Sequence, residues 1–245
     1  MHTSAVRDGD KYVINGTKRW ITDADEADFA QLLAVTDKDK GSRGGISLFL
    51  VDMDSPGVKI TAKYDTMMGD QPCEIHFDNV EIPIEHRVGE EGEGFGLGQR
   101  FLAHGRLKHG ARGVGTAQRC LDMMCTYAKQ RETFGHKLSD RQAIQWLITD
   151  THVETQAGRL MVYNAADMAS RGQLDRTDGF IQKMYADELG FRAADRCMQV
   201  HGGIGLTTDL PIEQFWRQAR SFRITEGPTE IMKWVIARNI LRNYD

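Results

Sequence analysis

The character of the chain changes near residue 86. Up to that point it consists of short apolar runs separated by turn-forming residues, a pattern typical of β-strands. Beyond it, apolar residues recur at helical spacing over long stretches with short connections, which favours an antiparallel helical bundle. The predicted helices cover residues 95–131, 140–171, 178–201 and 229–243.

This change predicts an α+β protein with two domains. We expect an incomplete β-barrel or β-sandwich domain over residues 1–88, followed by an antiparallel four-helix bundle over residues 89–245. The glycine-rich loop at 89–94 is interpreted as the joint between them.

The β-rich part contains one strong local signal. Residues 11–22 predict two strands joined by a turn at Asn15-Gly16, because Asn-Gly is the strongest short hairpin signal. The chain enters a predicted strand almost at its first residue, and a β-domain of this size normally has more strands than we can count. We therefore expect the chain to begin inside a domain. Further strands are predicted at residues 29–35, 46–51, 73–80 and 82–84.

The composition argues against several classes of protein. The 245 residues carry a net charge of -4 with scattered Lys and Arg, which argues against a nucleic-acid-binding surface. No apolar stretch is long enough to span a bilayer and no secretory segment opens the chain, so we expect neither a membrane span nor secretion.

Cysteine and histidine spacing predicts no metal site. The cysteines are expected as free thiols in a reducing compartment, because they lack metal-ligand spacing. They are Cys73, Cys120, Cys125 and Cys197. Five histidines also lack such spacing and are expected at the surface or at helix ends. These are His104, His109, His136, His152 and His201.

One carboxylate is set apart near the end of the chain. Glu226 precedes Gly227 and Pro228, at the mouth of the last predicted helix. Proline suits an opening helix turn, so Glu226 is expected on a bend, with its side chain directed out of the helix. By themselves these residues favour a carboxylate that complements the helix dipole, an effect of about 0.3–1 kcal/mol.

Four segments together resemble the acyl-CoA dehydrogenase family, the flavoenzymes that oxidise acyl-CoA thioesters. Each segment is a weak signal alone, but their order and separations are similar to those of the family over the whole chain. The family normally begins with a helical domain of roughly a hundred residues. That domain and the start of the β-domain are missing here, so the resemblance implies an N-terminally truncated member. The segments are residues 18–22 (KRWIT), 131–135 (RETFG), 199–205 (QVHGGIG) and Glu226-Gly227.

The resemblance implies a reaction and a base. It identifies Glu226 as the base that removes the α-proton of an acyl-CoA, while FAD accepts the β-hydrogen as hydride at its N5 atom. In some members the base lies on the first long helix instead, and here that position is Gly105, which carries no carboxylate. Arg106 and Gly227 are implied to lie near the substrate.

The resemblance also implies the residues that contact FAD. Trp20 is expected to cover the flavin ring, and Thr22 to donate a hydrogen bond at N5, although both residue types are also ordinary in strands. Arg131 is expected to pair with the pyrophosphate, although a cation near a helix C-terminus needs no ligand. Pro228 stands where many members carry threonine, which weakens the case for a contact at Thr229. The full set is Trp20, Thr22, Arg131, Phe134, Gln142, Gln199, Gly202, Gly203 and Thr229.

In the family, the segment that corresponds to Arg131, Phe134 and Gln142 reaches into a neighbouring subunit's FAD. The resemblance therefore implies a homodimer or homotetramer that works in fatty acid β-oxidation and passes electrons to an electron-transferring flavoprotein. The compartment would be the bacterial cytoplasm or, in a eukaryote, the mitochondrial matrix. An acyl-CoA oxidase, a flavin monooxygenase and a non-catalytic truncated subunit remain as alternatives, although Glu226 argues against the monooxygenase.

Overall fold

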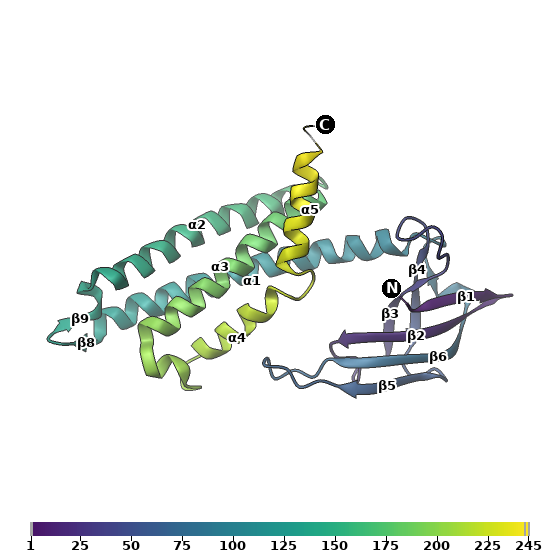
Figure 1. The fold of residues 1–245 in the computed structure, drawn as a ribbon, viewed down its shortest axis with the longest axis horizontal. Coiled ribbons are helices and arrows are strands. Elements are labelled where there is room, and N and C mark those ends of the chain that lie inside the picture. Colours follow the sequence, from purple (N-terminus) through teal and green to yellow (C-terminus); the bar gives the residue numbers. More distant parts are fainter. Residues whose placement is uncertain (1, 243, 245) are drawn as a thin grey trace. The chain divides into compact units, whose positions relative to one another are not determined.

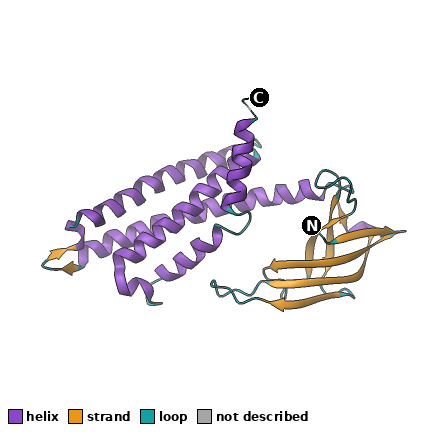
Figure 2. Cartoon of the chain, in the orientation of Figure 1, coloured by secondary structure: helices purple, strands orange, loops and turns teal. Residues whose placement is uncertain are grey.

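The computed structural model describes residues 2–242 and 244 of the chain (Figure 1). The chain forms two compact units, Met1–Phe101 and Leu102–Asp245. The strands of the large sheet belong to the first unit and most of the helical residues to the second (Figure 2). The predicted α+β class is confirmed.

The first unit is built on one large sheet. In its described part the sheet has seven strands, in the order β5-β6-β2-β1-β3-β4-β7. Neighbouring strands are antiparallel, except that β1 and β3 pair in parallel at Ser4 and Val35. The predicted strands at 29–35 and 46–51 are confirmed, whereas β5 and β7 were not predicted. The bounds are β1 Ser4–Asp8, β2 Lys11–Ile21, β3 Phe29–Val35, β4 Ile46–Asp52, β5 Val58–Lys63, β6 Cys73–Pro83 and β7 Arg87–Val88.

The predicted hairpin at Asn15-Gly16 is wrong. Strand β2 runs through both residues without a break, and the turn lies earlier, between Asp8 and its partner Lys11. Asn15-Gly16 instead forms an irregularity in the pairing of β2 with β6. Gly16 has a φ of 140°, and a Cβ there would lie 2.6 Å from the Cα of Thr3. The glycine therefore permits a bulge and a close backbone approach, which is the other common use of glycine in a strand.

The second unit is a helical bundle. The four predicted helices are confirmed to within a few residues, but the described residues form a fifth, α4, and a short hairpin that were not predicted. Helix α4 is only 11 residues long, a length at which helical periodicity is hard to recognise. The bounds are α1 Gly94–Gln130, β8 Glu132–Thr133, β9 His136–Lys137, α2 Gln142–Ser170, α3 Arg176–His201, α4 Ile212–Phe222 and α5 Thr229–Leu241.

Helices α1 to α4 share one apolar core, and successive helices run in opposite directions (Figure 1). Helix α5 crosses α3 and packs against it through a smaller cluster that includes Phe180 and Met232. None of the helices in residues 2–242 has the length and apolar character that crossing a membrane requires.

Helices α1 and α3 approach each other very closely. A Cβ added at Gly113 of α1 would lie 2.2 Å from the carbonyl oxygen of Ala186 on α3. One turn further along α3, a Cβ at Gly190 would lie 3.2 Å from the Cα of Gly113. The side-chain amide of Gln182, also on α3, donates a hydrogen bond of 2.8 Å to the carbonyl of Arg106. The absence of side chains at this crossing therefore sets the distance between the two helices.

This packing predicts opposite effects for two neighbouring glycines. Gly113→Ala should lower the free energy of unfolding by about 1–3 kcal/mol, because the methyl group forces α1 away from the α3 backbone. Gly115→Ala should raise it by about 0.5–1 kcal/mol, because a Cβ there meets no atom within 4 Å and alanine favours the helix. Urea unfolding followed by circular dichroism measures both. Equal stability of the two variants would contradict the proposed close approach.

Candidate active site

Glu226 lies in the turn between α4, which ends at Phe222, and α5, which begins at Thr229. Its backbone has a φ of 52°, in the left-handed region, and Gly227 follows with a φ of 115°. Pro228 directly precedes the helix, as predicted. A non-glycine residue in this region is held there by its surroundings at a cost of order 1–3 kcal/mol.

Lys183 of α3 holds this turn in place. Its Nζ atom donates hydrogen bonds to the carbonyl oxygens of Phe222 at 3.1 Å and Gly227 at 3.3 Å, on either side of Glu226. The third acceptor is Oδ2 of Asp187 at 2.8 Å, and neither side chain of this ion pair is exposed. Sequence reasoning missed both residues, although charges four positions apart in a helix were a usable signal.

The Glu226 carboxylate faces α1. A Cβ added at Gly105 would lie 2.2 Å from Oε2 of Glu226, so glycine leaves the space that the carboxylate occupies. Oε1 of Glu226 lies 3.5 Å from Nε2 of His109, one turn further along α1. The Glu226 side chain remains 32% exposed, which leaves it accessible to a ligand.

Arg106 lies beside this carboxylate but is buried. Its guanidinium carbon lies 4.3 Å from the centre of the Phe180 ring. Burial lowers the pKa of Arg106 and the neighbouring Arg176 lowers it further, while attraction to Glu226 acts in the opposite direction. Its predicted contact with substrate stays a prediction.

The prediction that the histidines lie at the surface or at helix ends is wrong for His109, which is buried in the middle of α1. His201 is also buried but is the last residue of α3, with its Nδ1 2.8 Å from the carbonyl oxygen of Cys197. His109 is 2% exposed and His201 is 5% exposed. Helical spacing places His109 on the face of α1 that meets α3, and His201 stacks on Tyr127 with ring centres 4.3 Å apart. Among the described residues, no group of three or more His, Cys, Asp or Glu side chains could hold a metal ion.

A second group of predicted site residues lies where α1 ends. Phe134 and Gly135 form the two-residue turn of the β8–β9 hairpin, with φ values of 51° and 74°, as in a type I′ turn. The Phe134 side chain is 95% exposed. Arg131 and Gln142, before and after the hairpin, are also exposed. A bulky aromatic residue so fully open to solvent is available to a ligand or another chain.

The glycine-rich segment after α3 belongs to the same end of the bundle. Gly202 ends α3 with a φ of 62°, and its N–H donates to the carbonyl of Gln199. A Cβ at Gly202 or Gly203 would meet no atom within 4 Å, so the backbone is open to close approach. His201 connects this segment to Tyr127, whose carbonyl accepts a hydrogen bond of 2.8 Å from the N–H of Arg131.

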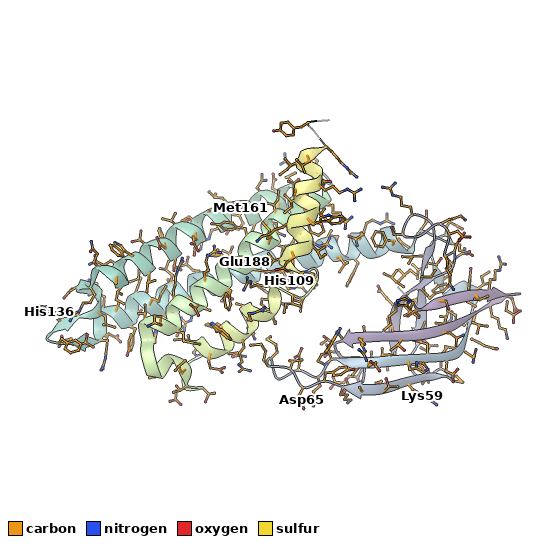
Figure 3. All side chains as sticks on the ribbon, viewed as in Figure 1. Lys59, Asp65, His109, His136, Met161 and Glu188 are labelled. Carbon is orange, nitrogen blue, oxygen red and sulfur yellow. The ribbon has the colours of Figure 1, made fainter. Side chains whose placement is uncertain are left out.

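We call these six residues the bundle-end group: Arg131, Phe134, Gln142, Gln199, Gly202 and Gly203. The structure does not bring this group to Glu226 within one chain. Gly105, which faces Glu226, and Gln130 lie on one continuous helix, and at about 1.5 Å per residue they are roughly 37 Å apart. Figure 3 labels His109 near the start of α5 and His136 at the hairpin.

Trp20 is strained and exposed in the first unit. It has a φ of 64° near the end of β2 and its side chain is 63% exposed. The ring packs on Tyr64 with centres 4.7 Å apart, and the Tyr64 hydroxyl donates to Glu74 at 3.1 Å. Thr22 follows the strand and is also exposed. Of the five described non-glycine residues with positive φ, three are predicted site residues: Trp20, Phe134 and Glu226.

Thr229 differs from the other predicted contacts, because it is buried. Its hydroxyl donates a hydrogen bond of 3.0 Å to Oε1 of Glu188, which is labelled in Figure 3. The hydroxyl is thus engaged within the bundle, and a contact of Thr229 with FAD stays a prediction.

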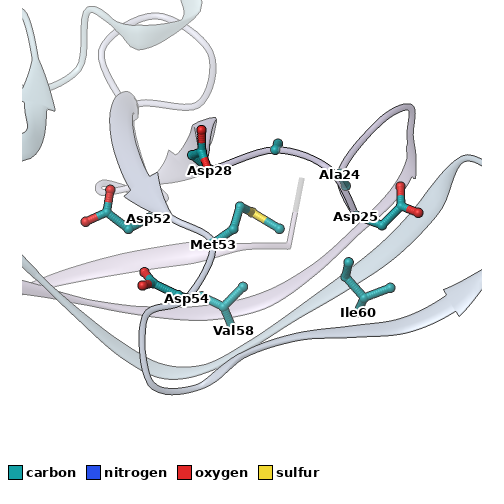
Figure 4. A pocket seen from close by; sticks show the side chains of 9 residues that line it. Ala24, Asp25, Asp28, Asp52, Met53, Asp54, Val58 and Ile60 are labelled. Carbon is teal, nitrogen blue, oxygen red and sulfur yellow. The ribbon is translucent and has the colours of Figure 1, made fainter.

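A hollow of about 560 Å³ in the first unit is a poor candidate for the site. It lies beside the start of β3 and the end of β4, and none of the predicted site residues line it (Figure 4). Four of its lining residues carry carboxylates, which repel the phosphate groups of a nucleotide or of coenzyme A. They are Asp25, Asp28, Asp52 and Asp54.

Comparison with known proteins gives a family over nearly the whole chain. Residues 1–80 match the family model for the acyl-CoA dehydrogenase middle domain. Residues 92–241 match the model for the acyl-CoA dehydrogenase C-terminal domain.

Individual relatives agree with this match. A probable acyl-CoA dehydrogenase of Mycobacterium tuberculosis is 38% identical in an alignment of 247 positions that covers 99% of this chain and 63% of that protein. The CarC subunit of the caffeyl-CoA reductase-Etf complex of Acetobacterium woodii is 37% identical, over 99% of this chain and 64% of its own length. Butyryl-CoA dehydrogenase of Megasphaera elsdenii has a solved structure that superposes with a TM-score of 0.91, at 32% identity, over 98% of this chain and 63% of its own. The chain thus spans less than two thirds of these relatives, and it belongs to the acyl-CoA dehydrogenase family.

Proposed function

We propose that the protein catalyses the FAD-dependent α,β-dehydrogenation of an acyl-CoA thioester to the trans-2-enoyl-CoA, with Glu226 as the base. The observation that carries this proposal is the position of the Glu226 carboxylate. It is held on a left-handed turn by Lys183, faces the space above Gly105 and remains partly exposed. A carboxylate that is fixed in place but still accessible suits proton abstraction next to a carbonyl.

The backbone at Glu226 can assist the same step. No backbone hydrogen bond of the described residues uses the N–H of Glu226. This N–H is therefore free to donate to the thioester oxygen, where negative charge develops as the α-proton leaves. In enzymes that stabilise an oxyanion, one such donor contributes about 3–4 kcal/mol to the lowering of the barrier.

The residues present fit FAD. An exposed guanidinium at Arg131 suits a pyrophosphate, and the flat exposed side chain of Trp20 suits the face of a flavin ring. Gly202 and Gly203 leave room that a Cβ would fill. When bound, FAD supplies the acceptor for the β-hydrogen, which no protein side chain can provide. The predicted roles of Thr22, Phe134, Gln142, Gln199 and Thr229 at this cofactor are part of the proposal.

The separation of the bundle-end group from Glu226 supports a site shared between two chains. One chain would contribute Glu226, and the bundle-end group of another would hold part of the same FAD. We therefore propose a homodimer or homotetramer. An electron-transferring flavoprotein is the proposed electron acceptor, which the Etf complex of the CarC relative supports. A cytoplasmic or mitochondrial location and a role in fatty acid β-oxidation complete the proposal.

Two other functions are supported by particular observations. The chain superposes with a TM-score of 0.93 and 26% identity on the prolyl acyl carrier protein oxidase AnaB, which supports an oxidase that transfers electrons to oxygen. The distance between the bundle-end group and Glu226 within one chain supports the second alternative, a subunit that binds but does not catalyse.

Cofactor binding gives the first prediction from the proposed function. The purified full chain should carry FAD and absorb at about 450 nm, as oxidised flavoproteins do. Arg131→Gln should reduce the bound FAD, because it removes the proposed partner of the pyrophosphate. His152→Gln, an exposed residue on α2, is the matched control. A colourless chain that also fails to bind added FAD would favour the non-catalytic subunit.

Glu226 gives the second prediction. Glu226→Gln should keep FAD but slow flavin bleaching by octanoyl-CoA at least about a hundredfold, because an amide cannot accept the α-proton. Stopped-flow absorbance measures this rate, and butyryl-CoA and palmitoyl-CoA extend the test to other chain lengths. A variant that bleaches at the wild-type rate with all three would place the base elsewhere.

Gly105 gives the third prediction. Gly105→Ala should slow bleaching on the order of a hundredfold while leaving FAD bound, because its methyl group displaces the Glu226 carboxylate. Gly115→Ala on the same helix is the matched control and should bleach normally. Equal rates in the two variants would show that the position of the carboxylate above Gly105 does not matter for the reaction.

A further inference from the structure

Two buried side chains near Glu226, those of His109 and Asp187, have no part in the proton abstraction proposed above. His109 on α1 lies between two carboxylates. Its Nδ1 is 3.5 Å from Oδ1 of Asp187, and its Nε2 is 3.5 Å from Oε1 of Glu226. The side chains of His109 and Asp187 are 3% and 0% exposed. One imidazole therefore connects the proposed base to a carboxylate in the interior of the bundle.

The contacts of Asp187 decide which nitrogen carries the hydrogen. Oδ1 of Asp187 and Nδ1 of His109 are both buried, and neither has a hydrogen-bond partner in the described part of the chain. Glu226 differs because it is partly exposed and can be solvated by water. Buried polar atoms need partners more than solvated ones do, so the hydrogen belongs on Nδ1, facing Asp187. In the neutral ring, Nε2 is then an acceptor, facing Glu226.

We propose that His109 is a positioning residue that receives the α-proton from Glu226, so that Asp187, His109 and Glu226 form a proton relay. The proposal rests on the proposed function, because it needs Glu226 to be the base. It goes beyond that function by assigning a second site that binds the proton, Nε2 of His109, inside the bundle.

The relay balances as two proton transfers. The bond between the α-carbon and its hydrogen breaks, its electron pair stays on the carbon, and an O–H bond forms on Glu226. That O–H bond then breaks as an N–H bond forms at Nε2 of His109, which restores the Glu226 carboxylate. The imidazole gains one positive charge and keeps the hydrogen on Nδ1, which is directed at Oδ1 of Asp187. The hydride leaves the β-carbon separately, to the flavin of the proposed function.

Charged groups from three elements surround the resulting imidazolium. Asp187 on α3 and Glu226 in the turn face it as carboxylates, and the nearby ammonium of Lys183 is already paired with Asp187. On α1 itself, the cationic residues Arg106 and Arg112 lie three positions before and after His109, and their charges act against the imidazolium. The remaining neighbour is the Phe222 ring of α4, which meets the imidazole edge-on with centres 5.0 Å apart. A carboxylate that orients a histidine and stabilises its charged form is the arrangement found in hydrolase triads.

The tautomer of His109 is the first test, and it needs neither flavin nor substrate. Nitrogen NMR of the uniformly labelled full chain at about pH 8, above the ordinary titration range of histidine, reads the hydrogen position on each ring nitrogen. We expect the His109 hydrogen on Nδ1 and none on Nε2. A hydrogen on Nε2 would overturn the relay, because Nε2 could then not accept the proton.

The pH dependence of flavin bleaching by octanoyl-CoA is the second test. The wild-type rate should fall on the acid side with a slope steeper than one, because both Glu226 and His109 must be free of the transferred proton. His109→Gln should bleach at least about tenfold more slowly, with a slope of one, an effect smaller than that of a group acting directly on substrate. His152→Gln should match the wild type.

Asp187→Asn gives an independent variant, because an amide cannot stabilise the imidazolium, and it should also reduce the slope to one. A His109→Gln profile that coincides with the wild type would overturn the relay and leave Glu226 as the base. Failure of the proposed function is distinguishable, since Glu226→Gln would then bleach like the wild type. If a variant fails to fold, the tautomer of His109 in the wild-type chain still tests the relay.

Discussion

The close approach of α1 and α3 is the constraint on which the candidate site depends. Because Gly113 and Gly190 have no side chains, the two backbones come near enough for the side chains of one helix to meet those of the other. One turn before Gly113, His109 meets Asp187, and Gln182 reaches the backbone of α1 at Arg106. Another turn earlier, Gly105 leaves the space that the Glu226 carboxylate occupies. A change in this helix separation would therefore alter every contact of Glu226 with α1.

Helix α3 also fixes the turn that bears Glu226. Lys183 extends from α3 and neutralises Asp187 while it holds carbonyl groups on both sides of the strained residue. A buried ion pair contributes little net stability, because both charges lose their hydration. The role of this ion pair is to position Glu226, since Lys183 keeps that residue in an unfavourable backbone conformation. The strain at Trp20 and Phe134 has the same pattern, a side chain presented to solvent by a backbone that does not relax.

The long helices, and the position of Glu226 on a bend before the last helix, could be predicted from the sequence, because helical periodicity and Gly-Pro turns are local signals. Sequence reasoning failed where tertiary packing decides. Asn15-Gly16 has the composition of a hairpin, but the close approach of Thr3 makes it a bulge. His109 has no metal-ligand spacing, which predicts a place at the surface or at a helix end, yet it is buried because its face of α1 meets α3. Helix α4 is too short for a periodic signal. The relation of His109 to Asp187 spans 78 residues, a distance at which the sequence of one chain carries no pairing signal.

The function proposed for Glu226 is removal of the α-proton of an acyl-CoA. Its most direct test is hydrogen exchange at the α-carbon of octanoyl-CoA in deuterated water, followed by mass spectrometry. We expect the wild-type chain to incorporate deuterium and Glu226→Gln, with FAD still bound, to incorporate none. Exchange by the glutamine variant at the wild-type rate would contradict it.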